Sequence, residues 1–130
     1  GGAKPTFPII ADEGLAVAKA FDMLPAEAYM PDGRTPNDSA TVRSVFIIGP
    51  DKQLKLSMTY PMSVGRNFAE VLRALDALQT TAKNGVATPA DWTVGQDVII
   101  PPSVSNEDAK AKFGEFDAVL PYLRKTKLPG

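Results

Sequence analysis

The sequence predicts an α/β fold, and this prediction rests on three observations. Residues 7–82 alternate between strand and helix patterns in the order strand, helix, strand, strand, helix. The run Val42–Ile48 is β-branched and aromatic with a continuous apolar end, which is typical of a strand buried on both faces. The segment Asn67–Thr80 has apolar residues at i, i+3 and i+4 spacing, the period of an amphipathic helix, and Asn84-Gly85 ends that pattern.

The composition is that of one ordinary globular domain. The chain has 130 residues, of which 44% are hydrophobic and 22% are charged. A net charge of −1 gives no electrostatic reason to expect nucleic acid or an anionic membrane as a partner. No apolar run approaches the roughly 20 residues of a membrane span, and residues 1–6 show no signal peptide. We therefore expect a cytoplasmic chain with no membrane span.

The absence of two residue types limits the chemistry open to this sequence. With zero cysteines it can form no disulfide, no thiolate nucleophile and no thiolate metal site. With zero histidines it has no imidazole base and no histidine-ligated metal. Catalysis by this sequence alone would have to use carboxylates, lysine, arginine or tyrosine, and we expect neither a metal nor a cofactor.

The N-terminal segment predicts a short strand, a helix and a loop. Phe7–Ile10 is an apolar run, and Pro8 places it at a sheet edge. A helical pattern opens at Asp12, an acid suited to a helix N-terminus, and Pro25 ends it. Turn-forming residues fill Tyr29–Ala40, which predicts a loop.

The centre of the chain predicts a β-hairpin. The apolar strand Val42–Ile48 is followed by the turn Gly49–Lys52. Leu54–Tyr60 then alternates apolar and polar residues, the pattern of a half-covered strand. A strand as apolar as the first needs a neighbour on each side, and this sequence offers one obvious neighbour.

The character of the sequence changes after residue 85. Asp97–Ile100 predicts a short strand, and Ser105 begins a helix with Asp108 three residues later. Phe116–Gly130 is apolar and basic with little periodicity. We therefore divide the chain into a domain at residues 7–85 and a C-terminal subdomain at residues 86–130.

Five stretches resemble the 1-Cys peroxiredoxin family, in family order and over nearly the whole chain from Phe7 onward. They are FPIIAD (Phe7–Asp12), TVRSVFIIGPDKQLKLSMTYP (Thr41–Pro61), GRNFAEVLRALDALQ (Gly65–Gln79), VATPADW (Val86–Trp92) and PYLRKT (Pro121–Thr126). The resemblance implies the C-terminal half of a thioredoxin-like peroxiredoxin fold, followed by the small 1-Cys C-terminal extension. The strand and helix order of residues 7–82 agrees, because a thioredoxin-like α/β sheet ends in that order. The resemblance also implies a thiol peroxidase that reduces hydrogen peroxide and alkyl hydroperoxides.

One part of the family pattern is not in this sequence. In the family, the first half carries the Pro-x-x-x-Thr/Ser-x-x-Cys loop, whose cysteine attacks the peroxide, together with central strands of the sheet. We therefore expect a partner, the N-terminal peroxiredoxin half with the peroxidatic cysteine, from a second chain or a cleaved parent. Peroxide is the expected substrate, and an external thiol is the expected reductant.

Arg43 is the first candidate site residue. It lies at the start of a buried strand, and burying a guanidinium without a partner is costly, so an anion should lie beside it. The alternative is a strand-end arginine that reaches solvent or pairs with Asp38. By resemblance, Arg43 matches the family arginine next to the peroxidatic thiolate.

Arg66 and Asp51 are the other polar residues singled out by the resemblance. A cation at a helix N-terminus opposes the macrodipole, so Arg66 is either solvated or placed for another reason. By resemblance it matches an arginine that supports the active-site pocket. Asp51 matches an aspartate of the phospholipase activity described for the mammalian family member, but an aspartate that bonds its own turn is the favoured interpretation.

The strand Leu54–Tyr60 is expected to be a sheet edge. The resemblance implies that it pairs with its two-fold mate to form a homodimer, unless Lys52 and Lys55 protect the edge. The alternative function is a non-catalytic fragment or interaction module that self-associates through open strand edges. Five basic residues are expected to form a solvated face: Lys110, Lys112, Arg124, Lys125 and Lys127.

Overall fold

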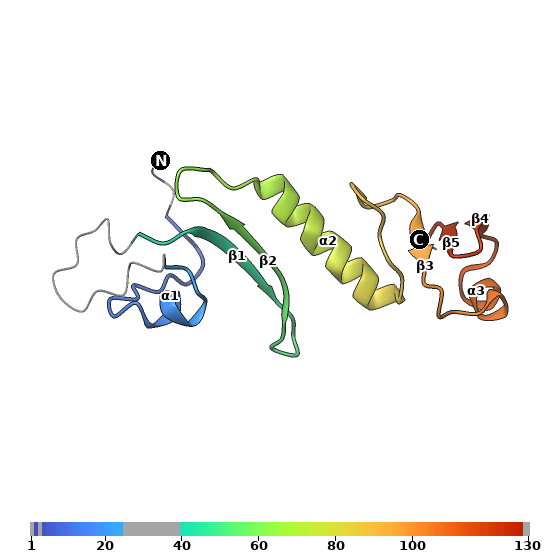
Figure 1. Cartoon of the computed structure of the whole chain (residues 1–130), viewed down its shortest axis with the longest axis horizontal. Helices are drawn as coiled ribbons and strands as arrows, with labels where there is room; N and C mark the ends of the chain where they lie inside the picture. Colours follow the sequence, from blue (N-terminus) through green and yellow to red (C-terminus); the bar gives the residue numbers. More distant parts are fainter. Residues whose placement is uncertain (1, 3, 25–39, 129–130) are drawn as a thin grey trace. The chain divides into compact units, whose positions relative to one another are not determined.

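A computed structural model describes residues 2, 4–24 and 40–128. They form two compact units, residues 1–66 and residues 67–130, which Figure 1 displays in sequence colours. The elements mix helix and strand, as expected of an α/β chain. The helix that follows residue 66 belongs to the second unit, so these units differ from the expected domains, residues 7–85 and 86–130. That domain division stays a prediction. Within the described residues, no helix is long and apolar enough to cross a bilayer.

The first helix, α1 (Ala16–Ala20), is shorter than its sequence pattern suggests. Leu15 adopts the left-handed conformation with φ of 55°, which delays the start of the helix. Asp12 still caps it, because its carboxylate oxygens accept hydrogen bonds from the backbone N–H groups of Val17 and Ala18, each at 2.9 Å. The expected helix N-terminal acid is therefore confirmed, although the helix begins later than expected.

The expected strand Phe7–Ile10 is wrong. These residues are irregular, and Phe7, Ile9 and Ile10 are each more than two-thirds exposed. A strand forms only where a neighbour satisfies its backbone groups, and no described strand pairs with this segment. Of the expected loop Tyr29–Ala40, residues 29–39 lie outside the described residues.

The predicted hairpin is confirmed. Strand β1 (Arg43–Ile48) pairs antiparallel with β2 (Leu54–Tyr60), and Figure 1 shows the two side by side. The register runs from Arg43 opposite Tyr60 to Ile48 opposite Leu54, with one irregularity near the turn. At that turn, a Cβ on Gly49 would lie 2.6 Å from the ends of the Asp51 and Lys55 side chains, so both side chains would have to shift to admit a larger residue.

Strand β1 is not buried on both faces, contrary to the expectation from its sequence. Residues 43–47 are half-buried and Ile48 is 52% exposed. An aromatic contact on this strand joins the rings of Phe46 and Phe21, whose centroids lie 4.8 Å apart. Among the described residues β1 pairs with a single strand, β2. This half-burial is what a strand with a single described neighbour shows.

The second unit begins with α2 (Phe68–Asn84), which extends beyond the expected end at Thr80. Its N-terminus is capped by the Asn67 side chain, which accepts a hydrogen bond from the Glu70 N–H at 3.1 Å. Its C-terminus is Asn84, followed by Gly85 in the left-handed conformation. The helix therefore ends at the dipeptide that the sequence indicated.

The remainder of the second unit is a small antiparallel sheet with one helix. Its strand order is β3 (Val98–Ile100), β5 (Leu123–Thr126) and β4 (Asp117–Leu120). Helix α3 (Asn106–Phe113) begins after Ser105, whose hydroxyl accepts the Asp108 N–H at 3.0 Å, as expected. The sequence from residue 116 has little periodicity and indicated no element there, whereas the structure forms β4 and β5. The residues of β5 do not follow the usual pattern of a buried strand, because its buried residues, Arg124 and Thr126, are polar.

The core of the second unit gathers around one tryptophan. Trp92 is 2% exposed and packs with the buried Val86 and Val98. Its indole N–H donates to the Gln96 carbonyl at 3.1 Å, so burying it leaves no donor unsatisfied. Three partly buried residues pack against this cluster: Ala77, Phe113 and Leu128.

Candidate functional site

Arg43 is the first residue of β1 and is half-buried. Its Nη1 donates to the Thr41 carbonyl at 3.3 Å, and its register partner is Tyr60, the last residue of β2. The alternative partner, Asp38, lies outside the described residues. The guanidinium is thus held at the open end of the hairpin, opposite the turn, by a backbone acceptor and by its strand.

Arg66 is exposed and lies in the segment that joins β2 to α2. It directly precedes Asn67, the residue that caps α2, so it stands just outside the helix. Glu70 in the first helical turn supplies the negative charge that a helix N-terminus favours. Arg43 lies opposite Tyr60, the last residue of β2, and Arg66 lies in the segment that leaves β2 at that residue.

Asp51 lies in the hairpin turn, at the other end from Arg43. Its carboxylate accepts the Gln53 N–H at 3.2 Å and pairs with the Lys55 ammonium at 2.5 Å. The hydrogen bond from Lys55, followed by that from Gln53, lowers the pKa of this carboxyl from its ordinary value. These contacts support the interpretation of Asp51 as a turn residue.

Strand β2 is a sheet edge in the described structure, because it ends the two-stranded order β1-β2. Leu56, Met58 and Tyr60 are half-buried on one face, while the residues between them are exposed. The Lys55 ammonium, which was expected to protect the edge, forms an ion pair with Asp51 in the turn. The outer backbone groups of β2 have the arrangement that another strand can pair with.

Arg124 is buried, so the expectation of a solvated residue is wrong. It is 4% exposed, and its Nη1 donates to the Asn106 side-chain oxygen at 2.7 Å. Its Nη2 donates to the carbonyls of Pro101 and Val104, both at 2.7 Å. The guanidinium also lies 5.8 Å from the centre of the Phe116 ring. Arg124 therefore holds the loop before α3 onto strand β5.

Arg73 is a second structural arginine that the sequence did not single out. It forms a bidentate ion pair with Glu70 on the same helix, at 2.5 and 2.8 Å. Its Nη1 donates to the Trp92 carbonyl at 3.1 Å. The hydrogen bond from Arg73 lowers the pKa of Glu70. The i, i+3 spacing of Glu70 and Arg73 was the signal that could have found this pair.

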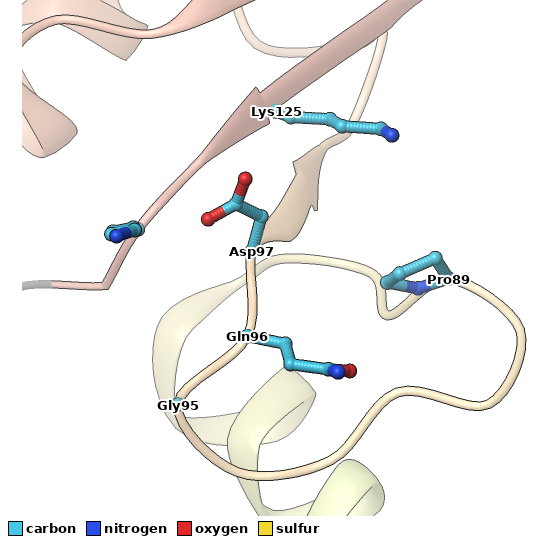
Figure 2. A pocket seen from close by; sticks show the side chains of 6 residues that line it. Pro89, Gly95, Gln96, Asp97 and Lys125 are labelled. Atoms are coloured by element: carbon cyan, nitrogen blue, oxygen red, sulfur yellow. The ribbon is translucent and has the colours of Figure 1, made fainter.

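A surface pocket of about 380 Å³ lies in the second unit. Figure 2 shows the Asp97 carboxylate pointing toward strand β5, which carries Lys125. The pocket contains neither Arg43 nor Arg66. Its charges are mixed, with residues of both signs among those that line it: Pro89, Gly95, Gln96, Asp97, Lys125 and Lys127.

Comparison with protein families gives a match to the C-terminal domain of 1-Cys peroxiredoxin at residues 77–115. The mitochondrial peroxiredoxin PRX1 of Saccharomyces cerevisiae is 55% identical over 123 residues, which cover 93% of this chain and 46% of the relative. The 1-Cys peroxiredoxin A of Oryza sativa subsp. japonica is 48% identical, over 98% of this chain and 59% of the relative. The chain thus spans about half the length of the curated relatives that it matches.

Two solved structures are similar to nearly the whole chain. A yeast mitochondrial 1-Cys peroxiredoxin superimposes with a TM-score of 0.82 at 52% identity, covering 94% of this chain and 56% of that one. A cysteine-to-serine mutant of peroxiredoxin 6 from Arenicola marina gives a TM-score of 0.82 at 46% identity, covering 98% and 60%. These similarities confirm the expected thioredoxin-like α/β fold.

Proposed function

The chain belongs to the 1-Cys peroxiredoxin family, and from this premise we propose that it is part of a thiol-dependent peroxidase. The substrates of that peroxidase are hydrogen peroxide and alkyl hydroperoxides. The observation that carries the proposal is the 55% identity to a curated peroxiredoxin over 93% of the chain. The sequence has no cysteine, so the nucleophile comes from residues outside this sequence.

The proposed partner is the N-terminal peroxiredoxin half, carried either by a second chain or by another part of a parent protein. Two features of the first unit support it. Strand β1 has one described neighbour although its sequence suits two. Phe7, Ile9 and Ile10 are exposed apolar residues beside no described strand. A segment that fills the sheet next to β1 would cover apolar surface of this kind.

We propose that Arg43 assists the reaction of the cysteine thiolate with peroxide. In the reaction a cysteine thiolate attacks one peroxide oxygen, the O–O bond breaks, and the leaving oxygen takes a proton while the sulfur becomes a sulfenic acid. A fixed guanidinium beside the thiolate lowers the thiol pKa and stabilises the charge on the leaving oxygen. Arg66 is proposed to support the same pocket. An external thiol then reduces the sulfenic acid.

The outer edge of β2 is the proposed homodimer contact. Two copies of Leu54–Tyr60 that pair antiparallel would form an isologous interface and satisfy the backbone groups of both edges. The half-buried face at Leu56, Met58 and Tyr60 would then continue across both copies. The cytoplasmic location stays a prediction, since the yeast relative is named as mitochondrial.

The experiment that tests the proposal measures peroxide consumption by the purified chain with dithiothreitol. The chain alone should show no saturable turnover, because it has no thiolate. Addition of a cysteine-bearing N-terminal peroxiredoxin half should restore turnover, and a serine variant of that half should not. Turnover above a buffer control by the chain alone, from a sample of verified mass, would contradict the proposal.

The alternative function is a non-catalytic interaction module that self-associates. Within the part of the chain that the structure describes, β1 and β2 each have one unpaired edge. Unpaired strand edges bind other strands, which favours this alternative. The same experiment separates the two functions. A module of this kind would form a defined oligomer and would gain no peroxidase activity from the added half.

A further inference from the structure

The end of α2 places a chemically labile dipeptide in a constrained conformation. In an Asn-Gly sequence the glycine amide nitrogen readily attacks the preceding side-chain amide, because glycine has no side chain to hinder its approach. Here Asn84 is the last residue of α2, and Gly85 caps the helix with φ of 63° and ψ of 43°. We infer that Asn84 is a deamidation site whose reaction is held back by the folded end of α2.

The reaction needs water alone as co-reactant. The Gly85 nitrogen forms a bond to Cγ of Asn84, the Cγ–Nδ2 bond breaks, and ammonia leaves with the amide proton. Water then opens the resulting succinimide at one of its two carbonyl carbons. Attack at Cγ gives aspartate, and attack at the backbone carbonyl gives isoaspartate. No atom is oxidised or reduced.

Two hydrogen bonds hold the reacting groups apart. The Gly85 N–H, whose nitrogen must attack, donates to the Thr81 carbonyl at 2.9 Å. The Asn84 side-chain nitrogen donates to the Thr80 carbonyl at 3.0 Å, which directs the amide back along the helix. The helical backbone of Asn84 fixes this arrangement. The helix end must therefore open before the ring can close.

Lys112 ties this helix end to the rest of the second unit. Its ammonium, on α3, donates to the Asn84 carbonyl at 2.7 Å. That carbonyl is one of the helix-terminal acceptors with no partner inside the helix, and a cation there is favoured by the macrodipole. The neighbouring Phe113 packs against the core around Trp92. The stability of the α2–α3 contact thus contributes to the barrier to deamidation.

The product would weaken the same helix end. Isoaspartate adds a methylene to the main chain, so the bond from Gly85 to Thr81 cannot keep its geometry. Either product places a carboxylate at the helix C-terminus, where the macrodipole disfavours negative charge. Deamidation is therefore an irreversible mark of a chain whose second unit has opened.

The test follows deamidation of the full chain at mildly alkaline pH by peptide mass mapping, in buffer and in concentrated urea. Residue 84 should convert faster in urea than in buffer. Lys112→Met keeps the length of the stem but removes the ammonium. It should raise the rate in buffer about two- to tenfold, the effect of one hydrogen bond on the opening equilibrium, and leave the rate in urea unchanged.

Three controls accompany this test. Lys110→Met changes an exposed lysine on the same helix and should leave the rate in buffer unchanged. Asn84→Gln should abolish conversion at this position, and Asn106, which precedes Glu107, should convert more slowly than Asn84 in urea. Hydrogen exchange of the Gly85 amide should rise in parallel with the rate of deamidation. Equal rates in buffer and urea, no conversion in urea, or an unchanged rate for Lys112→Met would each overturn the inference.

Discussion

Arg43 and Arg124 both lie in β-strands, yet their surroundings differ. Arg43 is half-buried and has one backbone acceptor, the Thr41 carbonyl. Arg124 is buried, and its guanidinium donates to one side-chain oxygen and two carbonyls without a described carboxylate partner. A buried guanidinium whose two Nη atoms donate to fixed protein oxygens suits a structural role. A half-buried guanidinium at the end of a strand can still receive an anion.

Replacing Arg124 with methionine should destabilise the second unit by about 2–4 kcal/mol, because the carbonyls of Pro101 and Val104 and the Asn106 side chain would lose their donor. Thermal or urea unfolding of the chain measures this difference. Lys125→Met is the matched control, since the next residue of β5 is on the opposite face and half-exposed. It should change stability by no more than about 0.5 kcal/mol. A change in the free energy of unfolding for Arg124→Met as small as that for Lys125→Met would contradict a structural role for the buried guanidinium.

Replacing Arg43 with alanine should slow peroxide reduction by roughly 10²-fold or more in a reconstituted or full-length enzyme. One preorganised charge-stabilising donor typically has an effect of this size. The pKa of the peroxidatic thiol should rise as well. Stopped-flow rates across pH measure both quantities, with Lys52→Ala at the far end of the hairpin as control. An unchanged rate constant and thiol pKa would leave Arg43 as an ordinary strand-end residue.

The candidate site could be predicted from the sequence only where a residue's role follows from local pattern or family resemblance. Asp51 was identified as a turn residue because Gly-Pro-Asp is a turn signal, and its contacts agree. Arg124 was misjudged because its acceptors come from residues 101–106, far from it in sequence. The charge of Arg124 therefore does not indicate whether its side chain is buried.

Helices and strands were likewise predictable where local sequence determines them, and not where they depend on distant residues. The start of α3 was predicted at Ser105 because that residue bonds to the amide three residues later. Asn67, the first residue of the expected second helix, caps α2 through the same local spacing. The strand expected at Phe7–Ile10 did not form, since a strand depends on a neighbour as well as on its own residues. Strand β5 formed despite weak periodicity, because it pairs with β3 on one side and β4 on the other.

Helix α1 should depend on pH through Asp12. The N–H groups of Val17 and then Ala18 lower the pKa of this carboxyl in the folded chain. Its contribution to stability is therefore present above its unfolded pKa of about 4 and is lost as the pH falls through the lower folded value. Hydrogen exchange of the Val17 and Ala18 amides should lose protection in that range.

Asp12→Ala should remove this protection at neutral pH, while Glu13→Ala, which changes the neighbouring exposed acid, should keep it. Exchange that is insensitive to both pH and Asp12→Ala would show that the carboxylate does not cap α1.

For the whole molecule, the main consequence of the fold is that the chain should not be a simple monomer. Strand β1 has an unfilled side among the described residues, and β2 ends the sheet on the other side. Unpaired backbone groups beside apolar side chains favour strand pairing. Sedimentation at tens of micromolar should therefore show self-association, which the N-terminal peroxiredoxin half should replace with a defined complex.

A proline on the outer edge of β2, as in Ser57→Pro, distinguishes the two edges. The proline should weaken the pairing of two copies through β2. Binding of the N-terminal peroxiredoxin half beside β1 should persist. A single monomeric species with cooperative unfolding would show that the chain closes its own sheet.

The hairpin also has consequences for the order of events in folding. The register partners that are most distant along the sequence are residues 43 and 60, so only a short loop must close to form the hairpin. Hairpins of this kind form in roughly 1–10 μs. Two strands alone are nevertheless only marginally stable in water. The hairpin should therefore form quickly, but its stability depends on contacts with further strands. Its strands can find their register early, and the lifetime of that register is set by how soon a further strand arrives.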